Sequence, residues 1–183
     1  NSSFISEENK AMVRQNVPSL LRYGVENSAT QSFLSCIADV YAYQNLLKNV
    51  PTIEQMRSII VDSLTIDLFV RHHNGSLAAI FNSINNKKSL SFLDIDKYKN
   101  TDFYKSLNLN NSSQYNFLVE TISAFENFIR YLKDEESYID HTYLWDIVSS
   151  ENPKLMKDGL NLIILEITNK DTTDNIELLC PTN

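Results

Sequence analysis

Glycine is scarce in this chain of 183 residues, which contains only Gly24, Gly75 and Gly159. A loop that wraps a phosphate needs several closely spaced glycines, because its backbone must approach the phosphate oxygens. Three isolated glycines can form neither a Gly-x-Gly-x-x-Gly turn nor a Walker loop. The common nucleotide-dependent enzymes are therefore excluded, and we expect the protein to use no cofactor.

Cysteine and histidine are almost as rare. The two cysteines, Cys36 and Cys180, lie far apart and form no Cys-x-x-Cys pair, which is typical of a reducing compartment such as the cytoplasm, although a disulfide between them stays open. His72 and His73 are adjacent, so on a helix they point in different directions, whereas metal ligands must share a face. We therefore expect no metal site.

Basic residues are in the minority. Sixteen Lys and Arg face 23 Asp and Glu, which gives a formal net charge of −7. Nucleic-acid binding needs clustered cations that neutralise phosphates, so we expect no nucleic-acid partner. No apolar run approaches the roughly 20 residues that cross a bilayer, so we expect no membrane association. The partner class that is left is protein, and the sequence does not determine the oligomeric state.

What the chain does contain is enough apolar surface for one core. Its hydrophobic fraction is 43%, which suits a single domain over residues 1–183. The chain starts without methionine and stops after a strand-like stretch, so we expect it to be a fragment of a longer protein. Asparagine makes up roughly one residue in nine, a bias typical of AT-rich genomes such as those of some large DNA viruses.

Helical spacing of apolar residues dominates the pattern. These residues recur every three or four positions in most of the chain, which predicts amphipathic helices. We expect helices over 32–47, 53–72, 77–84, 113–132 and 142–148. Thr52 and Gln55 form a capping box before the second of them. Residues 85–111 are polar and irregular, and we expect an exposed insertion there.

The period changes near the end of the chain. Residues 160–167 form a continuous apolar run of strand length, and residues 176–180 form a second strand-like segment after a polar turn. This pattern predicts a β-hairpin, which must lie on the helices or join other strands because two strands are not stable alone. The expected class is therefore α+β, a helix-rich domain with a C-terminal hairpin.

The segment over residues 31–41, which reads QSFLSCIADVY, resembles the nucleophile motif of a known family. That family is the OTU (ovarian-tumour-type) group of papain-like cysteine proteases and deubiquitinases, whose motif has the form Asp-Gly-Asn-Cys-Leu-Phe-x-Ala. In the alignment Phe33 and Leu34 fall on Leu-Phe, and Ser32 falls on the nucleophilic cysteine. The resemblance implies an OTU/papain-like architecture whose packing residues are kept and whose reactive position is changed.

A downstream segment supports the same resemblance. Tyr143 and Trp145 fall on the family's Tyr-x-Trp-Gly, with Asp146 in place of the glycine, and the apolar run over 160–167 follows in the family's order. The resemblance implies that Tyr143 and Trp145 are structural or face the substrate. The family's catalytic histidine cannot be assigned, because His141 precedes this segment instead of following the later strand.

Two side chains are candidate nucleophiles. Ser32 occupies the nucleophile position, yet a serine reacts only with a base and an oxyanion hole in place, and it is also a common helix N-cap. Cys36 lies one turn further along the expected helix, where a small buried hydrophobe is the simpler interpretation. Whether Ser32 is native or replaces a cysteine stays open.

Three hypotheses follow for the function. The first is a catalytically degenerate OTU-like pseudoenzyme that acts as a protein-interaction or structural module within a larger protein, with ubiquitin or a ubiquitin-like protein as the partner to test. The second is an active cysteine-type deubiquitinase. The third is a viral structural or assembly protein with an unrelated helical fold. If the protein is viral, we expect it in the host cytoplasm or the virion.

Overall fold

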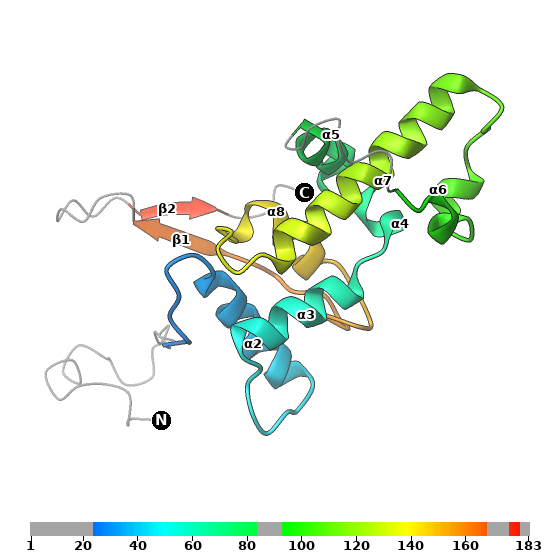
Figure 1. The fold of residues 1–183 in the computed structure, drawn as a ribbon. Coiled ribbons are helices and arrows are strands. Elements are labelled where there is room, and N and C mark those ends of the chain that lie inside the picture. Colours follow the sequence, from blue (N-terminus) through cyan, green and yellow to red (C-terminus); the bar gives the residue numbers. More distant parts are fainter. Residues whose placement is uncertain (1–23, 84–92, 168–175, 180–183) are drawn as a thin grey trace, which may run out of the picture.

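The computed structural model describes residues 24–83, 93–167 and 176–179, and the helix α7 is its central element (Figure 1). Helix α5 packs on one side of α7 and α3 on another, while α2 pairs with α3. The helices are α2 (Ser32–Gln44), α3 (Ile53–Ser63), α4 (Ile66–Phe69), α5 (Ser76–Ser83), α6 (Asp102–Lys105), α7 (Ser112–Lys133) and α8 (His141–Ser149), with short 3-10 turns η2 (His72–Gly75) and η4 (Ile95–Tyr98).

The expected α+β class is wrong, and so is the OTU/papain-like architecture. The core side chains of the described residues lie on helices, on the loops between them and, for Leu155 and Met156, on the segment that follows α8. Strands β1 (Ile164–Ile167) and β2 (Ile176–Leu179) are antiparallel, and among the described residues they pair only with each other. Two strands of four residues do not provide the sheet layer on which an α+β fold packs its helices. Cys180 lies outside the described residues.

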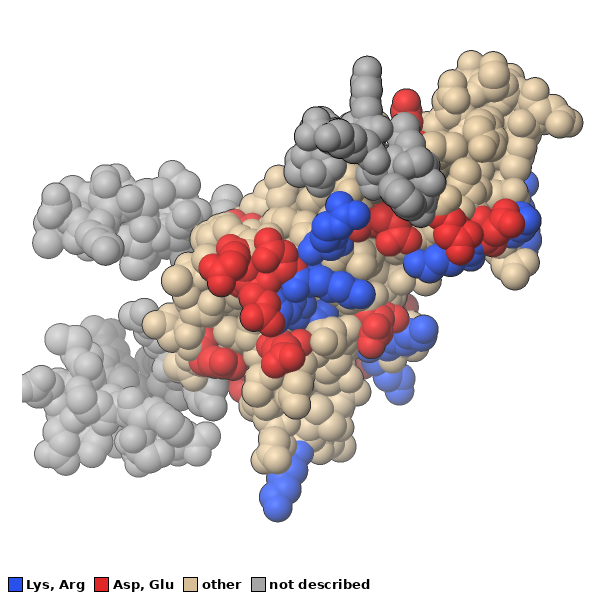
Figure 2. Space-filling view, viewed as in Figure 1, with Lys and Arg blue, Asp and Glu red and all other residues tan. Residues whose placement is uncertain are grey.

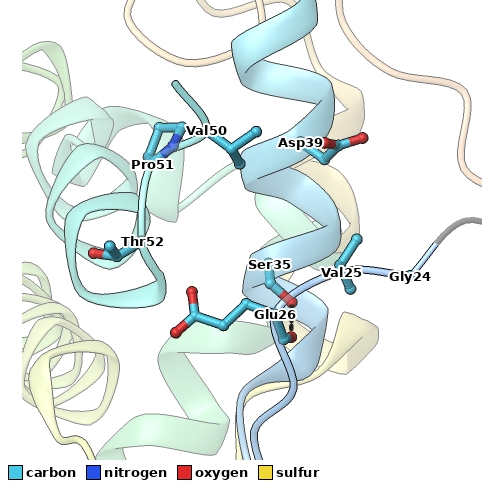
Figure 3. A pocket seen from close by; sticks show the side chains of 8 residues that line it. All are labelled: Gly24, Val25, Glu26, Ser35, Asp39, Val50, Pro51 and Thr52. Carbon is cyan, nitrogen blue, oxygen red and sulfur yellow. Dashed lines mark hydrogen bonds between the residues drawn. The ribbon is translucent and has the colours of Figure 1, made fainter. Parts of the chain in front are cut away.

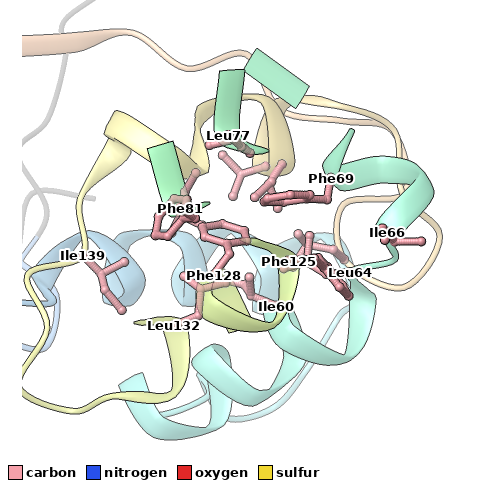
Figure 4. Close-up of a cluster of buried hydrophobic side chains, with 14 of the residues drawn as sticks. Ile60, Leu64, Ile66, Phe69, Leu77, Phe81, Phe125, Phe128, Leu132 and Ile139 are labelled. Carbon is pink, nitrogen blue, oxygen red and sulfur yellow. The ribbon is translucent and has the colours of Figure 1, made fainter. Parts of the chain in front are cut away.

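The apolar face of α7 builds the core. Five of its apolar side chains recur every three or four positions and are buried: Leu118, Ile122, Phe125, Phe128 and Leu132. The helix predicted over 113–132 is therefore confirmed, although Asn111 caps it, because the Asn111 side chain accepts from the backbone N–H groups of Ser113 and Gln114. Figure 4 shows the Phe128 ring beside that of Phe81 in this core.

The helix predicted over 53–72 is interrupted. Its start is confirmed, since Thr52 forms the expected capping box. Leu64 then takes an extended conformation, and the Thr65 hydroxyl accepts a hydrogen bond from Leu68 N at 3.2 Å, which caps the separate helix α4. A threonine that caps a new turn competes with continuation of the helix before it, so the chain bends here despite unbroken apolar spacing.

The described part of the expected insertion, residues 93–111, is anchored on the domain. Tyr98 and Phe103 in this part are buried, with 4% and 9% of their surface exposed. The backbone N–H of Phe103 also donates to Asp67 Oδ1 at 2.7 Å, which ties α6 to α4. In the described part of the chain, no helix has both the length and the apolar character needed to cross a membrane.

Candidate functional site

Ser32, the expected nucleophile position, is the first residue of α2. Its Oγ donates to the carbonyl oxygen of Ser28 at 2.6 Å and accepts from Ser28 N at 2.9 Å. No imidazole or carboxylate among the described residues hydrogen-bonds to this hydroxyl. A serine nucleophile needs such a base, so the geometry gives Ser32 the role of closing the turn that precedes α2.

Cys36, the second candidate, is a free cysteine on α2, and it is exposed, so its interpretation as a small buried hydrophobe is wrong. Partial burial of its sulfur raises the pKa of the thiol, and the carboxylate of Asp39 raises it further. Activation of a cysteine works in the opposite direction, because the reactive species is the thiolate. The surroundings of Cys36 thus favour the neutral thiol.

Tyr143 and Trp145, the predicted structural or substrate-facing residues, lie on α8. The Tyr143 ring packs on Phe81 with a centroid distance of 5.2 Å, so its contacts are those of a core residue. Trp145 lies against His141 at 6.0 Å, and His141 lies against Phe33 of α2 at 6.3 Å. The structure therefore brings α2 and α8 together, but through His141 and Phe33 and not through Ser32.

Gln31 is a structural residue that the sequence analysis missed. Only 2% of its surface is exposed. Its Nε2 donates to the carbonyl oxygens of Asp134 and Glu135, at 3.0 Å each, and of Ser137 at 3.1 Å. These bonds fix the start of α2 on the turn that follows α7. Its neighbours in the sequence, Thr30 and Ser32, are polar as well, so no local signal marks Gln31 as a buried residue.

An exposed apolar surface lies at the other end of α2, on its last turn and on the loop to α3. We call it the apolar edge, and its four side chains are Tyr43, Leu46, Leu47 and Val50, which are 82%, 90%, 46% and 49% exposed. The only charged residue between Tyr43 and Pro51 is Lys48. This end of the molecule, at the bottom of Figure 2, is mostly uncharged and protrudes from the rest. Contiguous exposed apolar side chains of this kind mark interaction surfaces.

Leu46 has an unusual backbone conformation. Its φ of 53° lies in the left-handed region, and Leu47 N donates to Ala42 O at 2.9 Å. This is the closing bond of a Schellman motif, in which the left-handed position is usually glycine. A left-handed leucine costs about 1–2 kcal/mol. Since Leu46 is also the most exposed member of the apolar edge, packing within the domain does not repay that cost, and the strain points to a function of the side chain.

A pocket adjoins the apolar edge, between α2, the start of α3 and the segment before α2 (Figure 3). Its volume is about 200 Å³. The pocket is lined by Gly24, Val25, Glu26, Ser35, Asp39, Val50, Pro51 and Thr52. Val50 belongs to both the pocket and the apolar edge, so the two form one continuous surface. Among the described residues, this lining contains two carboxylates and no basic side chain.

The turn η2 is a second strained feature. His73 and Asn74 have φ values of 50° and 52°, and the carboxylate of Asp146 on α8 accepts from His73 N at 2.5 Å. The buried Nε2 of His73 has no hydrogen-bond partner among the residues that the structure describes. No group of three or more His, Cys, Asp or Glu side chains among the described residues is arranged to hold a metal ion.

His72 in the same turn should make stability depend on pH. Burial lowers its pKa, outweighing the nearby carboxylate of Asp146 that raises it. The unfolded chain, with an imidazole pKa of about 6.5, then binds the proton first. We expect the unfolding free energy to be highest above about pH 6.5 and to fall as the pH drops below that value. Urea unfolding between pH 7 and 5.5 measures the slope, and His72→Gln should flatten it. An unchanged slope in the variant would contradict this assignment.

Comparisons with known proteins add no assignment to this geometry. No family model, no curated protein and no solved structure matches the chain. The function is therefore inferred from the geometry of the described residues.

Proposed function

We propose that this domain is a protein-interaction module and that the apolar edge is its docking surface. The observation that carries the proposal is Leu46, a strained leucine that is 90% exposed. Exposure of Tyr43 and Leu46 to water costs free energy that a bound partner recovers by burying them. Large apolar and aromatic anchors of this kind dominate the binding energy of interfaces.

The charge of the chain favours another polypeptide as the partner at the apolar edge over a second copy of the domain or a membrane. The chain has a net charge of −7, so a second copy would bring together two bodies of like charge. The same charge opposes approach to an anionic bilayer, where basic residues supply the attraction. A polypeptide that presents apolar side chains and is not acidic has neither disadvantage, and the single charge in the loop, Lys48, does not oppose its binding.

The first test is a selection of random peptides displayed on phage against the immobilised domain. We expect selected peptides to contain bulky apolar residues. The replacement Leu46→Asn should weaken the binding of these peptides at least tenfold, which corresponds to a loss of about 1.4 kcal/mol or more of binding free energy. Fluorescence polarisation measures the affinity. Asparagine is a good residue for the left-handed position, so the unfolding free energy should stay the same or rise by up to about 1 kcal/mol.

The matched control is Phe117→Asn. Phe117 is 50% exposed and lies near the start of α7, far from the loop between α2 and α3 (Figure 1). This variant also replaces an exposed apolar side chain by asparagine, so it should leave peptide binding unchanged. If the selected peptides bind Leu46→Asn as tightly as the wild type, the apolar edge is not the docking surface.

A further inference from the structure

We infer that the pocket beside the apolar edge receives a lysine or arginine side chain of the bound partner. The inference rests on the proposed docking surface and names the chemistry of the residue next to the partner's apolar anchors. The pocket and the apolar edge are continuous, because Val50 is 49% exposed on the apolar edge and also lines the pocket. A chain that covers Leu46 and Val50 therefore has the pocket within reach of its next side chains.

The pocket combines the two surfaces that a long basic side chain needs. Val25, Val50 and Pro51 offer apolar walls for an aliphatic stem, and Glu26 and Asp39 offer carboxylates for the charged end. Figure 3 shows the Glu26 carboxylate on the side of Thr52 and the Asp39 side chain further along α2, so the acids flank the apolar wall from two directions.

Both carboxylates keep binding capacity in the free domain. One oxygen of Glu26, Oε2, accepts from the backbone N–H of Ile53 at 3.3 Å, and Asp39 accepts no side-chain hydrogen bond among the described residues. Neither acid belongs to a salt bridge with another described residue. By contrast, Glu126 is paired with Lys97 at 3.0 Å and Asp96 with Lys99 at 2.7 Å. An incoming cation would therefore meet two carboxylates that form no salt bridge with any other described residue.

Size and charge exclude the main alternatives. The volume of about 200 Å³ is below the roughly 300–1,000 Å³ of typical small-molecule sites, so one side chain fits the pocket better than a free ligand. The described lining has two carboxylates and no basic group, which disfavours phosphate and other anions. A side chain of a peptide that is already bound at the apolar edge loses less translational entropy on entering the pocket than the same group free in solution.

The test uses one selected decapeptide and an analogue in which norleucine replaces its basic residue. We expect the phage selection to enrich Lys or Arg at a fixed distance from the apolar anchors. The protein variant is the double replacement Glu26→Gln and Asp39→Asn, which keeps the side-chain shapes and leaves the Gln oxygen able to accept from Ile53 N. It should bind the basic peptide about fivefold more weakly than the wild type at low salt. The norleucine analogue should bind both proteins equally.

The outcomes separate this inference from the proposed function. If the selected peptides lack basic residues, or if the double variant binds the basic peptide as well as the wild type does, the pocket inference is overturned. The docking surface still stands in that case, provided that Leu46→Asn weakens binding at least tenfold. If Leu46→Asn has no effect on the same peptides, both proposals fail. Circular dichroism of the double variant checks that it is folded.

Discussion

Replacement of Gly159 by alanine should lower the unfolding free energy by about 2–4 kcal/mol. Gly159 is buried after α8, with a φ of 70°, and an added Cβ would lie 2.5 Å from the carbonyl oxygen of Ser149. That oxygen cannot withdraw freely, because it accepts from Leu160 N at 3.2 Å. The variant therefore combines left-handed strain with a backbone clash. Urea unfolding of wild type and variant measures the difference.

Gly24→Ala is the control for this replacement. A Cβ at Gly24 would meet no atom of the described residues within 4 Å, and the φ of Gly24 is not in the left-handed region. The expected change in unfolding free energy is within about 0.5 kcal/mol. Equal stabilities of Gly159→Ala and Gly24→Ala would mean that the turn after α8 is not packed as described.

Replacement of Phe128 by alanine should lower the unfolding free energy by about 3–5 kcal/mol. Phe128 is fully buried on α7, and its ring centroid lies 4.8 Å from that of Phe81 and 5.5 Å from that of Phe69. The rings belong to α5 and α4, so the variant leaves a cavity where three helices meet. Many single domains have a total stability of only about 5–15 kcal/mol, so we expect a large fall in the urea midpoint.

Phe117→Ala is the matched control on the same helix. Phe117 is 50% exposed and keeps one edge contact with the Phe103 ring at 5.8 Å. Its removal leaves no buried cavity, so the unfolding free energy should fall by less than about 1 kcal/mol. A similar loss in both variants would contradict the placement of Phe128 at the centre of the core.

Periodicity predicted the helices well where apolar spacing and caps agree. The helix over 113–132 and the capping box at Thr52 illustrate this, because both signals are local. The break at Leu64 was missed because the apolar spacing continues through it. The bend at this position depends on Thr65, whose side chain caps α4. The presence of a threonine in a periodic segment does not show whether its side chain caps a helix.

The α+β expectation failed for a different reason. The continuous apolar run over 160–167 has the length of a buried strand, but only Ile164–Ile167 forms one, and Ile163 is 65% exposed. A short apolar run does not show whether its side chains meet a sheet, helices or solvent. The larger part of the core is supplied by helices that are far apart in the sequence, so the class depends on packing that a local pattern does not contain.

The candidate site could not be predicted from local sequence patterns either. The residues of the apolar edge, from Tyr43 to Val50, follow the same three-and-four spacing as core residues, which is why the pattern predicts a helix over 32–47. The structure ends α2 at Gln44 and turns the chain through Leu46, which exposes these side chains. The chain has no glycine at this turn, so the usual signal of a helix end is missing. The network around Gln31 joins residues about a hundred positions apart, and local pattern analysis does not reach that far.

The most direct test of the docking surface is amide hydrogen exchange of the domain with and without a selected peptide. We expect protection on binding to concentrate in residues 43–53, the loop from α2 into α3, and in residues 24–26 beside the pocket. Protection confined to other parts of the domain, such as the α8 face or the start of α7, would contradict the assignment of the apolar edge as the docking surface.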